Sequence, residues 1–128
     1  MPYAFSKTLD APFDEAVIRT RAVLAQEGFG VISEIDIQKT LSAKIGVDFP
    51  PYLILGACNP TLAHQALLIE PLVGTMLPCN VVVRRTPDGH VEVAAIDPVA
   101  SMAAIDNAEL AAKAAVVGDK LRAAIGRL

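Results

Sequence analysis

The sequence lacks any apolar stretch long enough to span a membrane. A membrane-spanning helix needs roughly 18 or more consecutive apolar residues, and Gly, Pro or charged residues interrupt each long apolar run of this chain. The first residues, M-P-Y-A-F-S-K, also lack the apolar core of a signal peptide. The sequence therefore predicts a cytoplasmic protein without a membrane partner.

Basic clusters and common catalytic motifs are also missing. The formal net charge is −3, the isoelectric point is near 5.2, and the longest basic cluster is Arg84-Arg85. Nucleic-acid binding depends on Lys and Arg contacts to phosphates, so no nucleic-acid partner is expected. The sequence contains no Ser-His-Asp arrangement, glycine-rich phosphate loop or H-E-x-x-H motif. No reaction, cofactor or metal follows from a motif.

Cysteine is scarce, and both cysteines lie in one distinctive stretch, Leu53 to Arg85. This stretch contains L-I-L-G-A-C-N-P, ending at Pro60, and L-P-C-N-V-V-V, ending at Val83. Cys58 and Cys79 are each followed by asparagine, and each Cys-Asn pair has a proline within one position. In a cytoplasmic protein such cysteines are expected to be free thiols.

The rest of the chain has the patterning of one globular domain, 1–128. The sequence is 128 residues long and 53% hydrophobic, which suits a single domain with a sizeable core. Alternating or continuous apolar residues and helical periodicity predict strands near 3–9, 29–36, 52–58, 79–85 and 90–97, and long helices near 12–27 and 106–126. The expected fold class is a two-layer α+β fold, β-α-β-β-β-β-α, with a mainly antiparallel five-stranded sheet. The long helices are expected on one face, and short helical inserts before and after the third strand.

Local signals mark where several helices begin and end. Gly28 is expected to end the first long helix in a left-handed conformation. Asn59 followed by Pro60 is typical of a helix N-terminus. Asp106 is the predicted N-cap of the last helix, with Glu109 three residues later. Residues 71–78 are predicted to form a loop.

The predicted sheet brings the cysteines together. In an antiparallel meander, the end of the third strand and the start of the fourth lie at the same end of the sheet. Cys58 and Cys79 occupy those two positions, and Asp97 follows the fifth strand at the same end. A parallel arrangement would separate the cysteines by a strand length, about 20 Å. We therefore expect a polar corner at this end of the sheet.

Five motifs carry a resemblance to a known family. They are G-F-G-V-I-S-E-I-D from Gly28, L-G-A-C-N-P from Leu55, A-H-Q-A-L from Ala63, L-P-C-N-V-V-V from Leu77, and Asp97-Pro98. On these motifs the protein resembles the uncharacterised family known as domain of unknown function 302, and the resemblance covers nearly the whole chain. The resemblance implies a compact β-α-β-β-β-β-α fold and a dimeric habit. It implies no established activity, so no catalytic roles follow from it.

The candidate site consists of the polar corner and two further carboxylates. The corner residues are Cys58, Asn59, Cys79, Asn80 and Asp97. Cys58 precedes a helix N-terminus, which favours a thiolate. The alternative is that both cysteines are core residues, because free cysteine packs as a small hydrophobe.

Three other polar residues are weaker candidates. Glu34 and Asp36 share one face of the second strand, at the opposite end of the sheet, where a solvated face is the preferred explanation. His64 is a candidate third metal ligand, but its spacing from the cysteines matches no known zinc pattern.

Three classes of function are compatible with this pattern. The first is a homodimeric binding or interaction domain with a small-molecule pocket at the cysteine corner. The second is a thiol-dependent redox or sulfur-handling enzyme that uses Cys58 and Cys79. The third is a structural dimer without a site. The absence of a base beside the cysteines disfavours efficient catalysis, so the first class is preferred.

Overall fold

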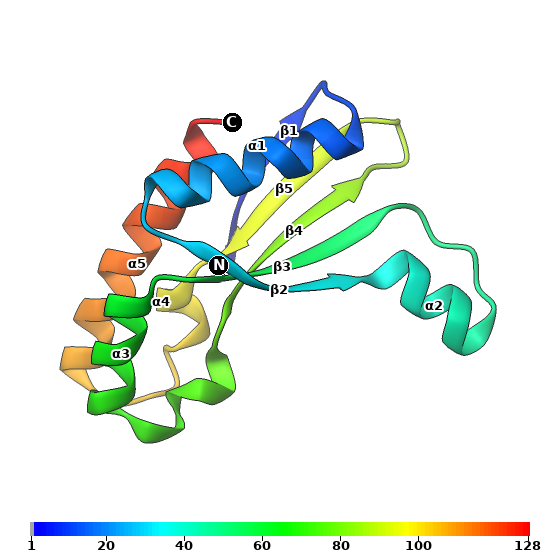
Figure 1. The fold of residues 1–128 in the computed structure, drawn as a ribbon. Coiled ribbons are helices and arrows are strands. Elements are labelled where there is room, and N and C mark those ends of the chain that lie inside the picture. The colour runs from blue at the N-terminus through cyan, green and yellow to red at the C-terminus, as the bar shows by residue number, and fades with distance from the viewer. Residues whose placement is uncertain (1) are drawn as a thin grey trace.

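The protein folds as a five-stranded antiparallel sheet with helices packed against one face (Figure 1). The structure, a computed structural model, describes residues 2–128. Its strands are Ala4–Leu9 (β1), Gly30–Asp36 (β2), Tyr52–Cys58 (β3), Cys79–Arg85 (β4) and Val91–Ile96 (β5). They lie in the order β1-β5-β4-β3-β2, with all neighbouring pairs antiparallel. The predicted α+β class and antiparallel sheet are confirmed.

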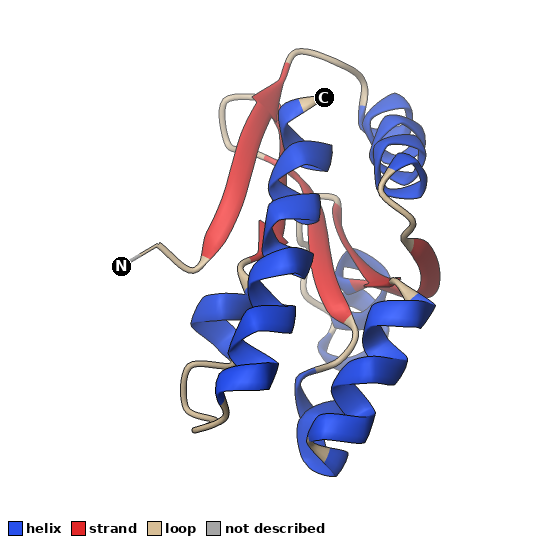
Figure 2. Ribbon diagram, turned by 90° about the vertical axis from the view of Figure 1, so that its left-hand side faces the viewer, coloured by secondary structure: helices blue, strands red, loops and turns tan. Residues whose placement is uncertain are grey.

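The helices divide into a long pair and several short segments. Their bounds are Phe13–Gln26 (α1), Ile37–Ile45 (α2), Pro60–Ile69 (α3), Pro98–Ser101 (α4) and Ala108–Gly126 (α5), with a 3-10 helix (η1) at Pro71–Met76. Figure 2 shows the side on which α5 lies. In Figure 1, α3 and α4 lie near the sheet end that α5 also reaches, whereas α2 projects from the opposite end. The short helices predicted around the third strand are α2 and α3. In the part of the chain described, none of the helices is long and apolar enough to cross a membrane.

Most of the predicted helix ends are correct, and two expectations are wrong. Gly28 has φ +84° after α1, as expected. The N-cap of α5 is Asn107, not Asp106, because the Asn107 side chain accepts a hydrogen bond from the Leu110 N–H at 3.0 Å. The segment predicted as a loop contains η1, whose first turn is stabilised by a hydrogen bond from the Leu72 N–H to the Glu70 carboxylate.

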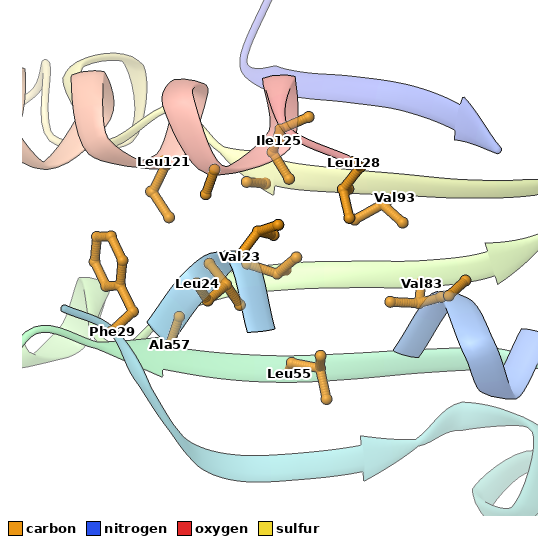
Figure 3. Close-up of a cluster of buried hydrophobic side chains, with 14 of the residues drawn as sticks. Val23, Leu24, Phe29, Leu55, Ala57, Val83, Val93, Leu121, Ile125 and Leu128 are labelled. Atoms are coloured by element: carbon orange, nitrogen blue, oxygen red, sulfur yellow. The ribbon is translucent and has the colours of Figure 1, made fainter. Parts of the chain in front are cut away.

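The main core lies between the sheet and the two long helices. Alternate residues of β3, β4 and β5 point toward the helices, and Leu55, Val83 and Val93 are fully buried there. Leu24 of α1 and Leu121 of α5 pack against them from the other side (Figure 3). Burial of one such side chain contributes about 1.5–3 kcal/mol to folding, so this cluster holds both long helices on the sheet.

A second cluster lies beyond the end of the sheet. Ala66 of α3, Val73 of η1, Met102, and Leu110 and Ala114 of α5 are buried together. This cluster fixes α3 and η1 against the first half of α5. Because the two clusters bury different stretches of α5, the space between them becomes important for the candidate site.

Candidate functional site

The sheet register places the two cysteines side by side at one end of the sheet. Cys79 pairs with Ala57, the residue before Cys58, in the antiparallel β3–β4 ladder. Paired residues have Cα atoms about 5 Å apart and successive residues rise by about 3.3 Å, so the Cα atoms of Cys58 and Cys79 lie roughly 6 Å apart. The antiparallel arrangement expected from the sequence therefore brings the cysteines together.

Both cysteines line a cavity of about 310 Å³. It lies between the main core and the second cluster, and its walls come from the end of the sheet, α3 and α5. Phe29, Cys79, Ala66 and Met102 are buried residues of its wall, and Ile32 is an exposed one. Most lining side chains are apolar. The cavity is thus a hydrophobic recess with a thiol-bearing wall.

The two thiols differ in their surroundings. Cys58 is partly exposed, whereas Cys79 is 6% exposed. Burial raises the pKa of the Cys79 thiol from 9.0 to about 11, and the neighbouring Cys58 adds to the shift because two nearby thiolates would repel. Cys79 is therefore a protonated, apolar-like thiol at neutral pH, and Cys58 is the more accessible group.

Asn59 lines the cavity and also fixes the start of α3. Its side-chain oxygen accepts a hydrogen bond from the Leu62 N–H at 3.3 Å, so it caps the helix as predicted. Its side-chain nitrogen would lie 3.0 Å from a Cβ atom placed on Gly28. The end of α1 and the start of α3 therefore meet at this asparagine, and a larger residue at position 28 would displace it.

Two of the predicted corner residues lie outside the cavity lining. Asn80 pairs with Gly56 and alternates with buried Cys79 and Val81, so it is exposed on the opposite face of the sheet. Strand alternation, which sends successive residues to opposite faces, explains this separation. Asp97 lies at the expected end of the sheet, but its carboxylate accepts a hydrogen bond from the Val99 N–H at 3.0 Å and caps α4. Pro98, the next residue, does line the cavity.

Glu34 and Asp36 lie far from the cysteines and have structural partners. Glu34 forms an ion pair with Arg21 of α1. The Asp36 side chain caps α2 by accepting a hydrogen bond from the Lys39 N–H at 2.9 Å. These contacts favour the solvated-face interpretation.

His64 is exposed on α3 and is not among the cavity-lining residues. Within residues 2–128, no three His, Cys, Asp or Glu side chains lie close enough to hold a metal ion.

Several cavity residues were missed by the sequence analysis. Leu62 and Ala63 of α3 and Lys113 of α5 all line the cavity. Lys113 follows Leu110 by three residues and precedes Val117 by four, so helical spacing places it beside the buried stripe of α5. That spacing was the available signal. The apolar residues carry none, since a cavity wall and a filled core have the same composition.

Another hollow, of about 560 Å³, lies beside α2. It is larger, but Lys39, Ser42, Ala43, Val47, Asp48 and Phe49, which line it, are all exposed. It is therefore an open surface groove. The cavity at the cysteines has a mostly apolar lining that is buried or partly buried apart from Ile32 and Leu67, so it is the better candidate for ligand binding.

The comparisons with known proteins agree with this fold. The family model described as domain of unknown function DUF302 matches residues 5–128. A crystal structure of an uncharacterized conserved protein DUF302 from Bacillus stearothermophilus is similar to this chain, with 30% sequence identity and a TM-score of 0.92, covering 99% of this chain and 98% of that one. No curated protein matches the chain. The chain belongs to the DUF302 family, whose function is not established.

Proposed function

We propose that this domain binds a small, largely apolar molecule in the cavity between the cysteine end of the sheet, α3 and α5. The observation that carries the proposal is the cavity itself, with its volume of about 310 Å³ and its apolar walls. An engineered apolar cavity of about 150 Å³ in another protein is large enough to bind benzene. The cavity here has room for a ligand about twice that size.

An apolar recess that is not filled by other side chains leaves its lining without packing contacts on one side. Protein interiors are close-packed and contain few voids larger than a water molecule. Cavity creation in a core costs roughly 24 cal/mol per Å³, so an enclosed void of this volume would cost about 7 kcal/mol. The recess is open, so its actual cost is smaller. Burial of an apolar molecule in the recess would still contribute several kcal/mol of favourable free energy, which is enough to support binding.

A cavity-filling substitution tests the proposal. Ala63→Leu adds three carbon atoms to a partly exposed lining residue of α3. Ala111→Leu is the matched control, since Ala111 is exposed on α5 and outside the lining. Isothermal titration with 1-octanol, a neutral probe, should show saturable binding to the wild-type protein and to Ala111→Leu. Ala63→Leu should weaken it at least about tenfold, which corresponds to 1.4 kcal/mol.

The outcome that contradicts the proposal is equally specific. If 1-octanol gives the wild-type protein neither a heat of binding nor shifts of the amide NMR signals of α3 and α5, the probe does not bind in this cavity. Equal binding by the wild-type protein and Ala63→Leu would place the probe elsewhere. Thermal melts of both variants establish that they are folded.

We further propose that the domain acts as a homodimer that covers the helix-free face of the sheet. On that face Ile35 pairs with Ile54, Ile54 with Val82, and Val82 with Ala94, so one apolar row crosses four neighbouring strands. The next row along β4 and β5 holds Arg84 and Glu92, which neutralise each other in an ion pair of 2.8 Å. A face with an apolar row and no net charge suits a second copy of itself, related by a two-fold axis.

Thiol chemistry is a second candidate function, because the partly exposed Cys58 and the buried Cys79 share one cavity wall. In this alternative the Cys58 thiolate attacks one sulfur of a small disulfide. A mixed disulfide with Cys58 forms, the S–S bond of the small disulfide breaks, and the released thiolate takes up a proton. Cys79 would then have to attack the mixed disulfide as a thiolate. Its pKa of about 11 leaves on the order of one molecule in ten thousand deprotonated at pH 7, so the second step is expected to be slow.

Pulse labelling separates the two thiols. After a short exposure to iodoacetamide at pH 7, mass spectrometry should show Cys58 labelled at least about tenfold faster than Cys79, since the thiolate is the reacting form. Cys58→Ala should leave a protein that is hardly labelled until it is unfolded. Faster labelling of Cys79 would reverse the assignment of roles, and no labelling of either cysteine would favour two core residues.

A further inference from the structure

The charge at the cavity lining is of one sign, positive. Among the described residues that line it, Lys113 is the only charged side chain, and no Asp or Glu lines it. Lys113 is partly buried, so part of its hydrocarbon stem packs against the wall, as amphipathic lysines do when the amine stays near water. The stem of Lys113 therefore forms part of the apolar wall, and the lining includes one side chain that carries a positive charge.

None of the ion pairs within 4 Å among residues 2–128 includes Lys113. Glu109 precedes it by one helical turn on α5 but does not form this contact. By comparison, Arg21, Arg84 and Arg127 each pair with a glutamate. The charge of Lys113 is thus left available to a group that enters the cavity.

The N-terminus of α3 also contributes a positive electrostatic potential. Asn59, the N-cap of α3, lines the cavity, so the positive end of this ten-residue helix lies at the wall. Helix N-termini stabilise nearby negative charge, by about 0.3–1 kcal/mol at exposed sites. The dipole and Lys113 both favour an anion, and the lining contains no carboxylate that would oppose one.

We propose that the natural ligand is an apolar carboxylate, with its chain in the cavity and its carboxylate on the ammonium group of Lys113. This inference rests on the proposed function, since it names the ligand class of the same cavity. The volume of about 310 Å³ equals about ten water-sized groups of 30 Å³ each. Octanoate, with eight carbons and two oxygens, has about this size.

The test compares three probes of equal chain length: octanoate, 1-octanol and octylammonium. Isothermal titration of the wild-type protein should rank them in that order, with octanoate about tenfold tighter than 1-octanol, because a charge-assisted contact typically contributes at least that difference. Raising the salt concentration should weaken octanoate binding and leave 1-octanol binding nearly unchanged.

Variants at position 113 assign the effect to charge. Lys113→Gln should bring octanoate to within about twofold of 1-octanol, because glutamine removes the charge, while Lys113→Arg should retain the preference, because arginine keeps it. Lys120→Gln is the matched control, because Lys120 is a partly buried lysine of α5 outside the lining. It should bind like the wild-type protein.

The outcomes distinguish the two proposals. Equal affinity for octanoate and 1-octanol in the wild-type protein overturns the carboxylate proposal and leaves the apolar cavity intact. If Lys113→Gln weakens the binding of octanoate and 1-octanol equally, Lys113 contributes packing and not an ion pair. This result also overturns the carboxylate proposal. A protein that binds none of the three probes contradicts the proposed function itself.

Discussion

Cys79 connects burial to chemistry at the scale of a single residue. Strand alternation turns its side chain to the helix-covered face, where the apolar surroundings keep the thiol protonated. Cys58 lies one position beyond the end of that pairing and is partly exposed. The same Cys-Asn motif thus gives two different thiols, because tertiary position and not local sequence sets their environment.

The raised pKa of Cys79 predicts a loss of stability at alkaline pH. Between the unfolded value near 9.0 and the folded value of about 11, the unfolded chain releases the thiol proton while the folded chain keeps it. The free energy of unfolding therefore falls as pH rises through this window, by about 2–3 kcal/mol in total, and is unaffected by this group below it.

Urea melts at several pH values from about 8, one unit below the window, to about 11, its upper edge, measure this loss. Cys79→Ala should lack this part of the decline, whereas Cys58→Ala should keep most of it. Identical slopes for the wild-type protein and Cys79→Ala would show that the thiol of Cys79 is not desolvated in the folded state.

Gly56 is the residue at which any side chain should be harmful. A Cβ atom there would lie 2.1 Å from the Ser33 hydroxyl oxygen and 2.7 Å from Cγ of Pro78. Gly56→Ala should therefore cost about 1–3 kcal/mol through overpacking. Because Pro78 also lines the cavity, the same substitution should weaken 1-octanol binding.

The control for this prediction lies on the adjacent strand. Gly30 has nothing within 4 Å of its Cβ position, so Gly30→Ala should change the free energy of unfolding by less than about 1 kcal/mol. Chemical denaturation of both variants measures the difference. A Gly56→Ala variant as stable as Gly30→Ala would mean that Ser33 and Pro78 move aside without cost.

At the scale of elements, α5 serves both hydrophobic clusters. Its first half, with Leu110 and Ala114, belongs to the second cluster, and its second half, with Leu121 and Ile125, belongs to the main core. The cavity lies where these two stretches meet, beside Lys113 and Val117. The helix therefore supplies stability at its two ends and the candidate binding wall between them.

Leu121→Ala should be strongly destabilising. The side chain is completely buried and faces Phe29 and the sheet in Figure 3, so its truncation should lower the free energy of unfolding by about 2–5 kcal/mol. Val116→Ala on the exposed side of the same helix should cost less than about 0.5 kcal/mol. Denaturant melts that give Leu121→Ala a loss below about 1 kcal/mol would show that this stripe is not packed.

At the scale of the whole molecule, the two faces of the sheet are covered unequally. The long helices α1 and α5 cover one face of the sheet, and the paired row of Ile35, Ile54, Val82 and Ala94 stays at least partly accessible on the other. Sheets usually bury such an apolar face against a further layer. A second copy of the chain is the layer that we propose.

Sedimentation velocity at tens of micromolar should show a dimer for the wild-type protein. Val82→Lys should give a folded monomer, because it places a charge in the middle of the proposed interface. Val116→Lys, on the exposed side of α5, should remain dimeric. A wild-type monomer at this concentration would contradict the assembly without affecting the single-chain cavity.

The sequence by itself determined the five strands, the two long helices, the short helices around β3 and the order of these elements. Alternation in β3 to β5, the glycine after α1 and the Asn59-Pro60 start of α3 are local signals, and each depends on the chain's own sterics and hydrogen bonds. Adding antiparallel pairing to these elements was enough to bring Cys58 and Cys79 to one end of the sheet. Which asparagine or aspartate caps a helix was less certain, because neighbouring residues such as Asp106 and Asn107 compete for one position.

Only the tertiary structure decided what surrounds the cysteines. Strand alternation removed Asn80 from the corner, and the capping of α4 occupied Asp97. The cavity arises because α3 and α5 meet in the second cluster and leave a space before the main core begins. Empty space has no signature in a sequence, since the residues around a cavity are as apolar as those of a filled core. Helical spacing places Lys113 beside the buried stripe of α5, but the presence of a cavity there depends on how two helices distant in the sequence pack together.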